Sequence, residues 1–269
     1  MKGTILKMLY GAIIGDIVGS RFERNKTYTK DFELFTFDCK FTDDSVLTCA
    51  VYEATRNIIK QKLSDVDAVN EYVRQMQKWG RNHIGAGFGA SFRQWIALDN
   101  PQPYGSFGNG SAMRVSPIGW MFNSLEEVEH YATLSAIVSH NHPEGIKGAI
   151  ATAGAIFLAR QGKTKEEVLD YIASLGYTYE NCEYYISLNQ FDVSCQGTIP
   201  RVMAILNESN SFTDVIRTAI SIGGDTDTNA CIAGSIAEAL YGIPEEMKQD
   251  CDKYFDTLVR EIVKEANGG

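Results

Sequence analysis

The sequence predicts an all-α protein, and three observations lead to that fold class. Apolar residues recur at spacings of three and four along most of the chain, which is the period of an amphipathic helix. Alternation with a period of two, which marks a half-buried strand, is almost absent. Apolar residues make up 44% of the 269 residues and no stretch is poor enough in them to act as a linker. We therefore expect a single compact helical domain over residues 1–269.

The first expected helix covers residues 5–20, where Gly11, Gly15 and Gly19 recur every four residues. This spacing suits close packing against another helix, because glycine brings two backbones together. Two lysines before an apolar run superficially resemble a secretory signal, but Asp16 interrupts the run and no clean cleavage pattern follows. We therefore assign this segment to the core.

The next part of the chain alternates helical periodicity with loops. Residues 21–40 lose the helical period and are expected to form a long loop, after which the pattern resumes at Asp44. Residues 65–79 are predicted to form another helix. Residues 80–110 hold three glycine-rich patches, and glycine lets backbone approach a ligand closely.

The remainder of the chain is also expected to be helical. A capping box at Thr164 introduces a peripheral helix, whereas residues 177–193 follow no clear pattern. The helix expected over residues 227–241 is apolar nearly all round, so we place it at the centre of the fold. The expected helices are residues 111–121, 124–139, 144–160, 164–175, 197–206, 211–222, 227–241 and 244–266.

Composition excludes several classes of function. The formal net charge of -9 argues against broad binding to nucleic acid or anionic membranes, since both need clustered Lys and Arg. A small anionic ligand remains compatible if bound cations supply positive charge. The six cysteines form no CxxC pair, which is typical of reduced thiols and predicts a cytoplasmic protein with neither a disulfide framework nor a zinc site. No run approaches the roughly 20 apolar residues that cross a bilayer.

Two clusters of oxygen-bearing side chains stand at the starts of expected helices. One is Thr42-Asp43-Asp44 and the other is Gly223-Gly224-Asp225-Thr226-Asp227-Thr228. Asp and Thr at a helix start are ordinary caps, and this remains the alternative for each cluster alone. The second helix is expected to be buried, however, and enclosed carboxylates need partners, of which cations are the best. Together the clusters offer only oxygen ligands, which suits Mg²⁺, Mn²⁺ or Ca²⁺ and leaves room for two ions.

Three further features could carry chemistry. Glu23 alone is an ordinary loop acid, more often solvated than catalytic. The segment of residues 105–114 could receive phosphate oxygens on its backbone while Tyr104 or Phe107 stacks on a base, or it could be a tight turn between helices. His140 and the nearby His142 lack a third ligand at metal-motif spacing, so a helix cap or a core hydrogen bond is the alternative to a site.

Taken in order along the chain, these motifs resemble those of ADP-ribosylglycohydrolases, the dinitrogenase-reductase-activating-glycohydrolase-like family. The two acidic motifs with a glycine-asparagine-glycine motif between them make the resemblance specific. It implies an all-α, orthogonal multi-helix domain with a binuclear Mg²⁺ or Mn²⁺ centre in a central cleft, and hydrolysis of the bond between ADP-ribose and an acceptor. The matching stretches are Gly15-Asp16-Ile17-Val18-Gly19 with Glu23, Phe41-Thr42-Asp43-Asp44-Ser45, residues 108–114, Ser139-His140 and residues 223–228.

Carried over position by position, the resemblance gives roles to individual residues. The ligands of two Mg²⁺ or Mn²⁺ ions would be Thr42, Asp43, Asp44, Asp225, Asp227 and Thr228. Glu23 would handle a proton or orient the attacking water, so the catalytic set would be Glu23, Asp43, Asp44 and Asp227. The substrate would contact Gly105, Ser106, Phe107, Gly108, Asn109, Gly110, Ser111 and His140. Ser45 and Asn229 depart from the family pattern, but neither departure removes a ligand.

The implied partner is an ADP-ribosylated protein or an ADP-ribose-containing small molecule. Two other readings stay open: a catalytically silent member that binds ADP-ribose or serves a structural role, and a two-metal phosphohydrolase acting on a nucleotide. The variable loops over residues 21–40 and 177–193 are expected to select the acceptor.

Overall fold

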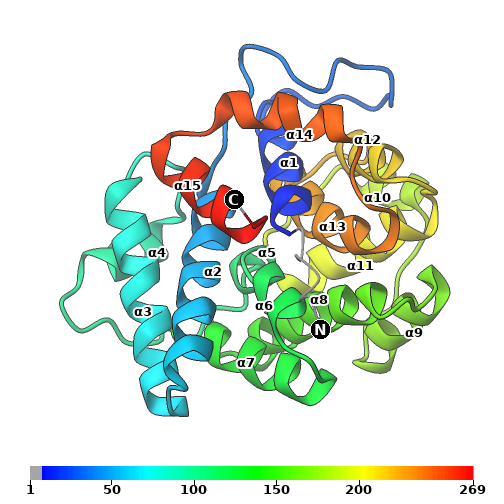
Figure 1. The fold of residues 1–269 in the computed structure, drawn as a ribbon. Helices are drawn as coiled ribbons and strands as arrows, with labels where there is room; N and C mark the ends of the chain where they lie inside the picture. Colours follow the sequence, from blue (N-terminus) through cyan, green and yellow to red (C-terminus); the bar gives the residue numbers. More distant parts are fainter. Residues whose placement is uncertain (1–7, 269) are drawn as a thin grey trace.

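The computed structural model describes residues 8–268, and helices account for its regular structure (Figure 1). No strand occurs within those residues, and one isolated bridge pairs Gly108 with Ser194. The all-α prediction is therefore confirmed. The helices are α1 (Tyr10–Gly19), α2 (Asp43–Gln61), α3 (Asp65–Asn82), α4 (Ala90–Ala97), α5 (Gly110–Met113), α6 (Ser116–Met121), α7 (Leu125–Ile137), α8 (Pro143–Arg160), α9 (Lys165–Ser174), α10 (Cys182–Leu188), α11 (Cys195–Asn207), α12 (Phe212–Ser221), α13 (Thr226–Tyr241), α14 (Glu245–Cys251), a short 3₁₀ turn (Asp252–Tyr254) and α15 (Thr257–Ala266).

The structure departs from the predicted helices at four places. Helix α4 was expected to be part of a glycine-rich loop, and α10 lies in the stretch without a clear pattern. The helix predicted over residues 111–121 is divided into α5 and α6, because Pro117 lacks an N–H and fits only the first turn of a helix. The helix predicted over residues 244–266 is divided before α15, where the side chain of Asp256 caps the new helix. Residues 5–7 of the first expected helix lie outside the described residues.

Helix α13 lies at the centre and packs against α1, α8, α11 and α12. Its pairing with α1 is very close, because a Cβ atom at Gly11 would lie 2.3 Å from the carbonyl oxygen of Gly234 and one at Gly15 would lie 2.1 Å from that of Ala230. Gly19 lies against the backbone of Asp227, so the two helices run antiparallel. The end of α1 therefore meets the start of α13.

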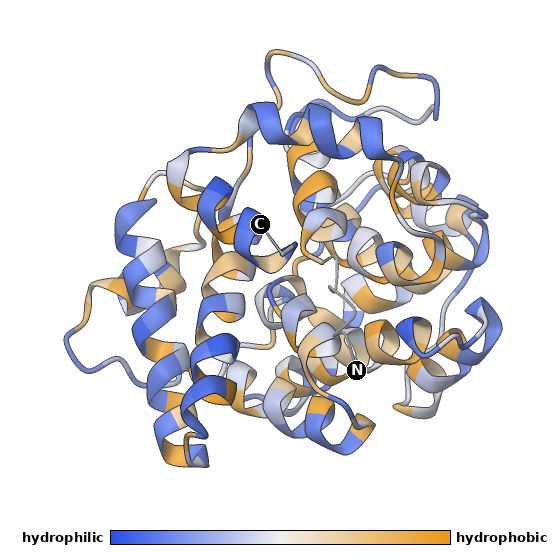
Figure 2. Cartoon of the chain, viewed as in Figure 1, coloured by the Kyte–Doolittle hydropathy of each residue, from blue (hydrophilic) through white to orange (hydrophobic). Residues whose placement is uncertain are grey.

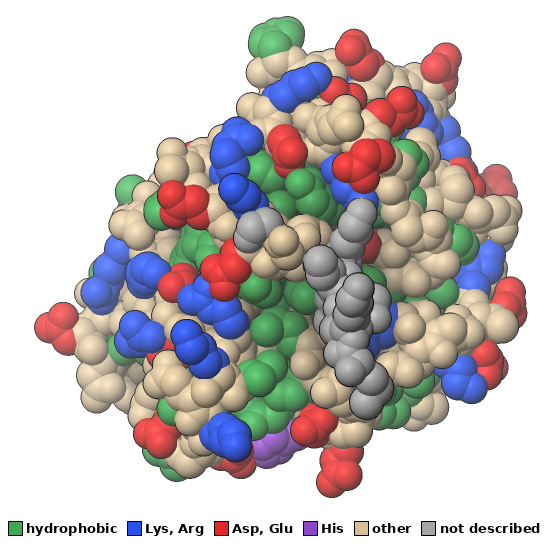
Figure 3. Space-filling view, viewed as in Figure 1, with side chains coloured by type: hydrophobic (Ala, Val, Ile, Leu, Met, Phe, Trp, Pro, Cys, Tyr) green, Lys and Arg blue, Asp and Glu red, His purple; other side chains and the backbone are tan. Residues whose placement is uncertain are grey.

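Apolar side chains fill the space between the helices. In Figure 2 the hydrophobic residues gather on α1, α8 and α13, whereas the outer helix α3 carries many hydrophilic residues. The six cysteines are all free, and all of them are buried. On the face shown in Figure 3, acidic and basic side chains are interspersed around apolar patches. Across residues 8–268, no helix combines the length and hydrophobicity that a bilayer span requires.

Candidate active site

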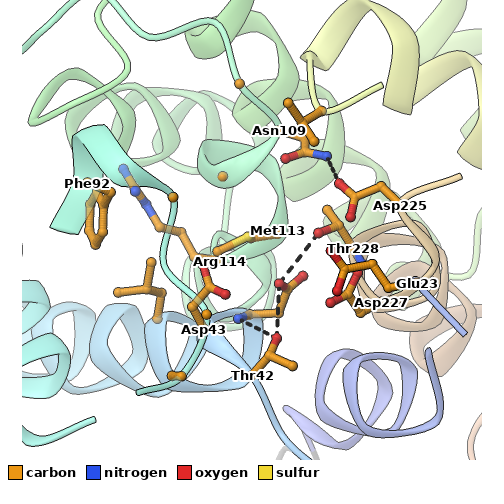
Figure 4. Close-up of a pocket in the computed structure, with 18 of the residues that line it drawn as sticks. Glu23, Thr42, Asp43, Phe92, Asn109, Met113, Arg114, Asp225, Asp227 and Thr228 are labelled. Atoms are coloured by element: carbon orange, nitrogen blue, oxygen red, sulfur yellow. Dashed lines mark hydrogen bonds between the residues drawn. The ribbon is translucent and has the colours of Figure 1, made fainter. Parts of the chain in front are cut away.

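A cavity of about 790 Å³ opens where α1 ends and where α2 and α13 begin (Figure 4). Its size lies within the range of small-molecule sites. The walls come from the loop after α1, the first turns of α2 and α13, helix α4, the glycine-asparagine-glycine segment and the segment before α11. The side chains that define it include Glu23, Thr42, Asp43, Asp44, Phe92, Tyr104, Asn109, Arg114, His140, Phe191, Val193, Asp225, Asp227 and Thr228.

The fold brings the two acidic clusters together. Thr42 is the N-cap of α2, and the hydroxyl of Thr228 in the first turn of α13 donates to Asp44 Oδ2 at 3.4 Å. Carboxylate oxygens of Asp16, Asp44 and Asp227 all lie within 4.8 Å of one another. The amino ends of both helices thus point their partial positive charge at the carboxylates, which favours negative charge there.

Asp16 is a member of this cluster that was not among the predicted metal ligands, although it lies in one of the stretches that match the family. Its side chain is fully buried and accepts hydrogen bonds from the backbone N–H of Thr42 at 2.8 Å and of Ser45 at 3.0 Å. The hydroxyl groups of Thr42 and Ser45 also donate to it. Asp16 therefore holds the start of α2 in place beside the other carboxylates. An acid within an otherwise apolar helix was the signal that could have identified it.

Burial and mutual repulsion raise the pKa values of four carboxyl groups here, those of Asp16, Asp43, Asp44 and Asp225. Burial is the largest cause for each of them, and the charge of Asp227 adds to it for Asp16, whose pKa is raised to about 6. For Asp43 burial and the charge of Asp16 raise the pKa to about 7. The pKa values of Asp44 and Asp225 are raised well above the ordinary value of 3.8. The site therefore holds more negative charge than the protein alone stabilises.

This arrangement fits divalent cations. Within the described part of the chain, no Lys or Arg forms an ion pair with a carboxylate of the cluster. Oδ1 of Asp44 is buried and has no hydrogen-bond partner among residues 8–268, although a buried carboxylate oxygen normally has one. Carboxylate and hydroxyl oxygens are the ligands that hard cations such as Mg²⁺ and Mn²⁺ prefer.

Comparison with known proteins agrees with this geometry. The sequence model of the ADP-ribosylglycohydrolase family matches residues 2–268. The chain belongs to the ADP-ribosylglycohydrolase family. It is accordingly a hydrolase, and its helical fold is that of the family.

Relatives and solved structures of this family resemble the whole chain. The ADP-ribosylhydrolase ARH3 of Mus musculus is 27% identical, with 93% of this chain and 88% of the relative covered. The ADP-ribosylhydrolase ARH3 of Homo sapiens is 26% identical, with 93% and 89% covered. A solved ADP-ribosylglycohydrolase-related protein complex superposes with a TM-score of 0.70 at 20% identity, covering 95% of this chain and 93% of that chain.

The glycine-asparagine-glycine segment of this glycohydrolase supports the acidic cluster as well as the cavity wall. The amide of Asn109 donates to Asp225 Oδ2 at 2.7 Å and to Thr198 Oγ1 at 3.0 Å. Gly87, which has a φ of 114°, belongs to another glycine-rich patch, and a Cβ atom there would lie 3.1 Å from Asp43 Oδ1. Glycine in these loops therefore makes room for side chains of the cluster.

The structure brings only part of the predicted substrate-binding set to the cavity. Five of these residues line it: Ser106, Gly108, Asn109, Gly110 and His140. The other three do not. Ser111 is fully buried and its hydroxyl donates to the Gly145 carbonyl at 2.6 Å, so it supports the loop. Phe107 is half exposed and packs edge-on against His142, next to Gly105, which takes a left-handed φ of 68°.

Glu23 lies in the loop after α1, half-buried at the wall of the cavity and near Asp227 (Figure 4). Burial and the charge of Asp227 raise its pKa, although Arg24 and Lys40 oppose the shift. A carboxyl group with a raised pKa beside a cavity is suited to proton transfer near neutral pH.

Several lining residues of the glycohydrolase site were missed by the sequence analysis. Phe92 comes from α4, which was not predicted, while Phe191 and Val193 come from the stretch without a clear pattern. Both aromatic side chains lie on short segments flanked by turn residues, where periodicity carries little information. Arg114 also lines the cavity and is fully buried.

Proposed function

We propose that this family member is a divalent-metal-dependent hydrolase that cleaves the N- or O-glycosidic bond between ADP-ribose and an acceptor and releases ADP-ribose. One observation carries the proposal: buried carboxylates from α1, α2 and α13 converge on a cavity without a cationic partner among the described residues. The family membership of the chain supports the choice of substrate.

The proposed ligands of two Mg²⁺ or Mn²⁺ ions are Thr42, Asp43, Asp44, Asp225, Asp227 and Thr228, which lie in the first turns of α2 and α13 or just before them. Paired cations of this kind, when bound, would bind vicinal ribose hydroxyls and polarise a water molecule. Asp16 orients the start of α2 behind these ligands, and Asn109 orients Asp225.

The chain's own residues would then perform the remaining tasks. Glu23 accepts a proton from the attacking water, or orients that water, while the bond from the anomeric carbon to the acceptor breaks through an oxocarbenium-like transition state. The water oxygen bonds to that carbon, and the acceptor leaves with the bonding electrons and takes up a proton from Glu23 or from solvent. His140 and the backbone of Ser106 and Gly108 line the part of the cavity assigned to the ADP end. The rings of Phe92 and Tyr104 provide apolar surface there.

The acceptor side of the cavity is assigned to the long loop after α1 and to Phe191 and Val193. The proposed substrate is an ADP-ribosylated protein or an ADP-ribose-containing small molecule. The six free, buried thiols support a reducing, cytoplasmic setting for it. A panel of ADP-ribosylated peptides and small molecules with defined linkages identifies the preferred acceptor.

The direct test compares Glu23→Gln with the matched control Glu33→Gln, an exposed acid of the same loop whose backbone carbonyl, retained in the variant, accepts from Arg21. Free ADP-ribose released by each protein is measured with Mg²⁺ and with EDTA. We expect a loss of about 10²–10⁴-fold for Glu23→Gln, no loss for the control, and no release in EDTA.

Other outcomes would identify the competing functions. Release of phosphate or AMP would indicate a nucleotide phosphohydrolase. Binding of ADP-ribose in calorimetry without turnover of any substrate would indicate a silent binding protein. Wild-type activity of Asp227→Ala would overturn the metal site itself.

A further inference from the structure

Three buried side chains form a hydrogen-bonded chain that ends at the cavity. Arg114, at the end of α5, is fully buried, and its Nη2 donates to the backbone carbonyl of Ser135 at 3.0 Å and to Ser139 Oγ at 3.1 Å. Ser139 Oγ lies 2.8 Å from Nδ1 of His140. His140 in turn lines the cavity.

The chemistry of these groups fixes the direction of each hydrogen bond. A guanidinium group can only donate, so Ser139 Oγ accepts from Arg114. The hydroxyl then has one hydrogen to donate, and among the described residues its other partner is Nδ1 of His140. The reverse assignment would leave a buried hydroxyl hydrogen without an acceptor, which is unfavourable. Nδ1 therefore accepts and carries no proton.

The imidazole of His140 is also held neutral. Burial, followed by the nearby charge of Arg114, lowers its pKa well below the ordinary 6.5. A neutral imidazole without a proton on Nδ1 carries its proton on Nε2. The pair of Arg114 and Ser139 thus selects one of two tautomers.

The Nε2 atom faces the glycine-asparagine-glycine segment. A Cβ atom at Gly110 would lie 3.1 Å from it and one at Gly108 would lie 3.6 Å from it, so the two glycines leave space beside this nitrogen. No described residue accepts a hydrogen bond from His140 Nε2. The N–H group is therefore available to an oxygen of a ligand in the cavity.

We infer that Arg114 and Ser139 are positioning residues that fix His140 in its Nε2–H tautomer, so that it donates a hydrogen bond to an oxygen of the bound nucleotide sugar. The identity of this ligand rests on the proposed function, whereas the tautomer does not. Arg114 and Ser139 touch no substrate atom in this scheme and act through His140.

The test measures the tautomer directly. Protein labelled with ¹⁵N-histidine is studied by long-range ¹H–¹⁵N NMR at pH 7.5, in wild type, Ser139→Ala and the matched control Ser135→Ala. Ser135 is a buried serine of α7, and Ser139 follows the end of that helix. The carbonyl of Ser135 accepts from Arg114, and alanine keeps that carbonyl. We expect the Nε2–H pattern in wild type and control, and a mixture of tautomers in Ser139→Ala. A wild-type proton on Nδ1, an imidazolium, or an unchanged tautomer in Ser139→Ala would overturn the inference.

A binding measurement tests whether the hydrogen-bonded chain from Arg114 through Ser139 to His140, called the relay below, contributes to ligand binding. Calorimetry with ADP-ribose should show about tenfold weaker binding for Ser139→Ala, as expected when one hydrogen bond is lost, and unchanged binding for Ser135→Ala. Gly110→Ala, whose Cβ crowds Nε2, should weaken binding and leave the tautomer unchanged. If the NMR result holds but no protein binds ADP-ribose, the relay stands and the proposed function fails. If wild type binds ADP-ribose and Ser139→Ala binds it equally well, the role of the relay in binding is overturned.

Discussion

Replacing Asp16 by asparagine and by alanine separates the two tasks of this side chain, which are to hold the start of α2 and to add negative charge to the cluster. In the asparagine variant the amide oxygen can still accept from the backbone N–H groups of Thr42 and Ser45. The amide NH₂ then faces Thr42 Oγ1, which can accept as well as donate. In the alanine variant these donors lose their partner.

The magnitudes follow from the structure. Both variants remove the same charge, so the difference between them reports the rest of the side chain, which is its hydrogen bonds and its packing volume. Two buried backbone N–H groups left without an acceptor cost about 1–3 kcal/mol each, so asparagine should be more stable than alanine by about 2–6 kcal/mol. Removing the charge also releases repulsion, because burial and Asp227 raise the pKa of Asp16 to about 6, which corresponds to about 3 kcal/mol. Without metal, Asp16→Asn should thus be at least as stable as wild type.

The two tasks are measured by two assays. Urea unfolding in EDTA at pH 7.5 gives the free energy of unfolding of each protein. Calorimetric titration with Mn²⁺ gives metal affinity, which should fall about 10–100-fold in both variants because a neighbour of the ligands has lost its charge. Equal stability of the asparagine and alanine variants would refute the hydrogen-bond reasoning. Wild-type Mn²⁺ affinity in Asp16→Asn would refute the role of the charge.

Three further predictions follow from the site and the fold. In EDTA, the free energy of unfolding should fall as pH rises from about 4 through 7. The pKa values of Asp16 and Asp43 are raised to about 6 and about 7, so these groups keep protons in the folded state that the unfolded state loses. Urea unfolding at pH 5 and pH 8 checks this, and a protein more stable at pH 8 would contradict it. Asn109→Ala should weaken Mn²⁺ binding about 10–100-fold in calorimetry, since Asp225 loses its amide donor, and unchanged affinity would exclude that support. Gly15→Ala should destabilise the protein by about 3 kcal/mol or more in thermal unfolding, since the new Cβ would lie 2.1 Å from a carbonyl oxygen of α13. Gly85→Ala, where the added Cβ meets nothing within 4 Å, is the neutral control. Equal melting temperatures of the two variants would contradict the close packing of α1 on α13.

Most helices could be predicted from the sequence because their signals are local. Hydrophobic periodicity and capping residues locate the start of α2 and both ends of α9 and α12 within a few residues, and these signals need no knowledge of the rest of the chain. The same reasoning failed at α4, whose buried Phe92 and Trp95 lie on only two turns between glycine-rich loops. It also failed where Pro117 divides a predicted helix, since apolar residues continue on both sides of the break.

The sequence by itself determined the all-α class, the two acidic clusters at helix starts and the family of the chain, because periodicity, caps and motif order are properties of consecutive residues. Only the tertiary structure decided which side chains meet. Asp16 joins the cluster because glycines let α1 pack directly on the backbone of α13, which places the end of one helix beside the start of the other. Arg114 and Ser139 reach His140 only because α5 packs against α8, which leaves Arg114 within reach of Ser135 in α7 and of Ser139 just after that helix. Such contacts depend on the packing of distant helices, about which the spacing of residues along the chain carries no information.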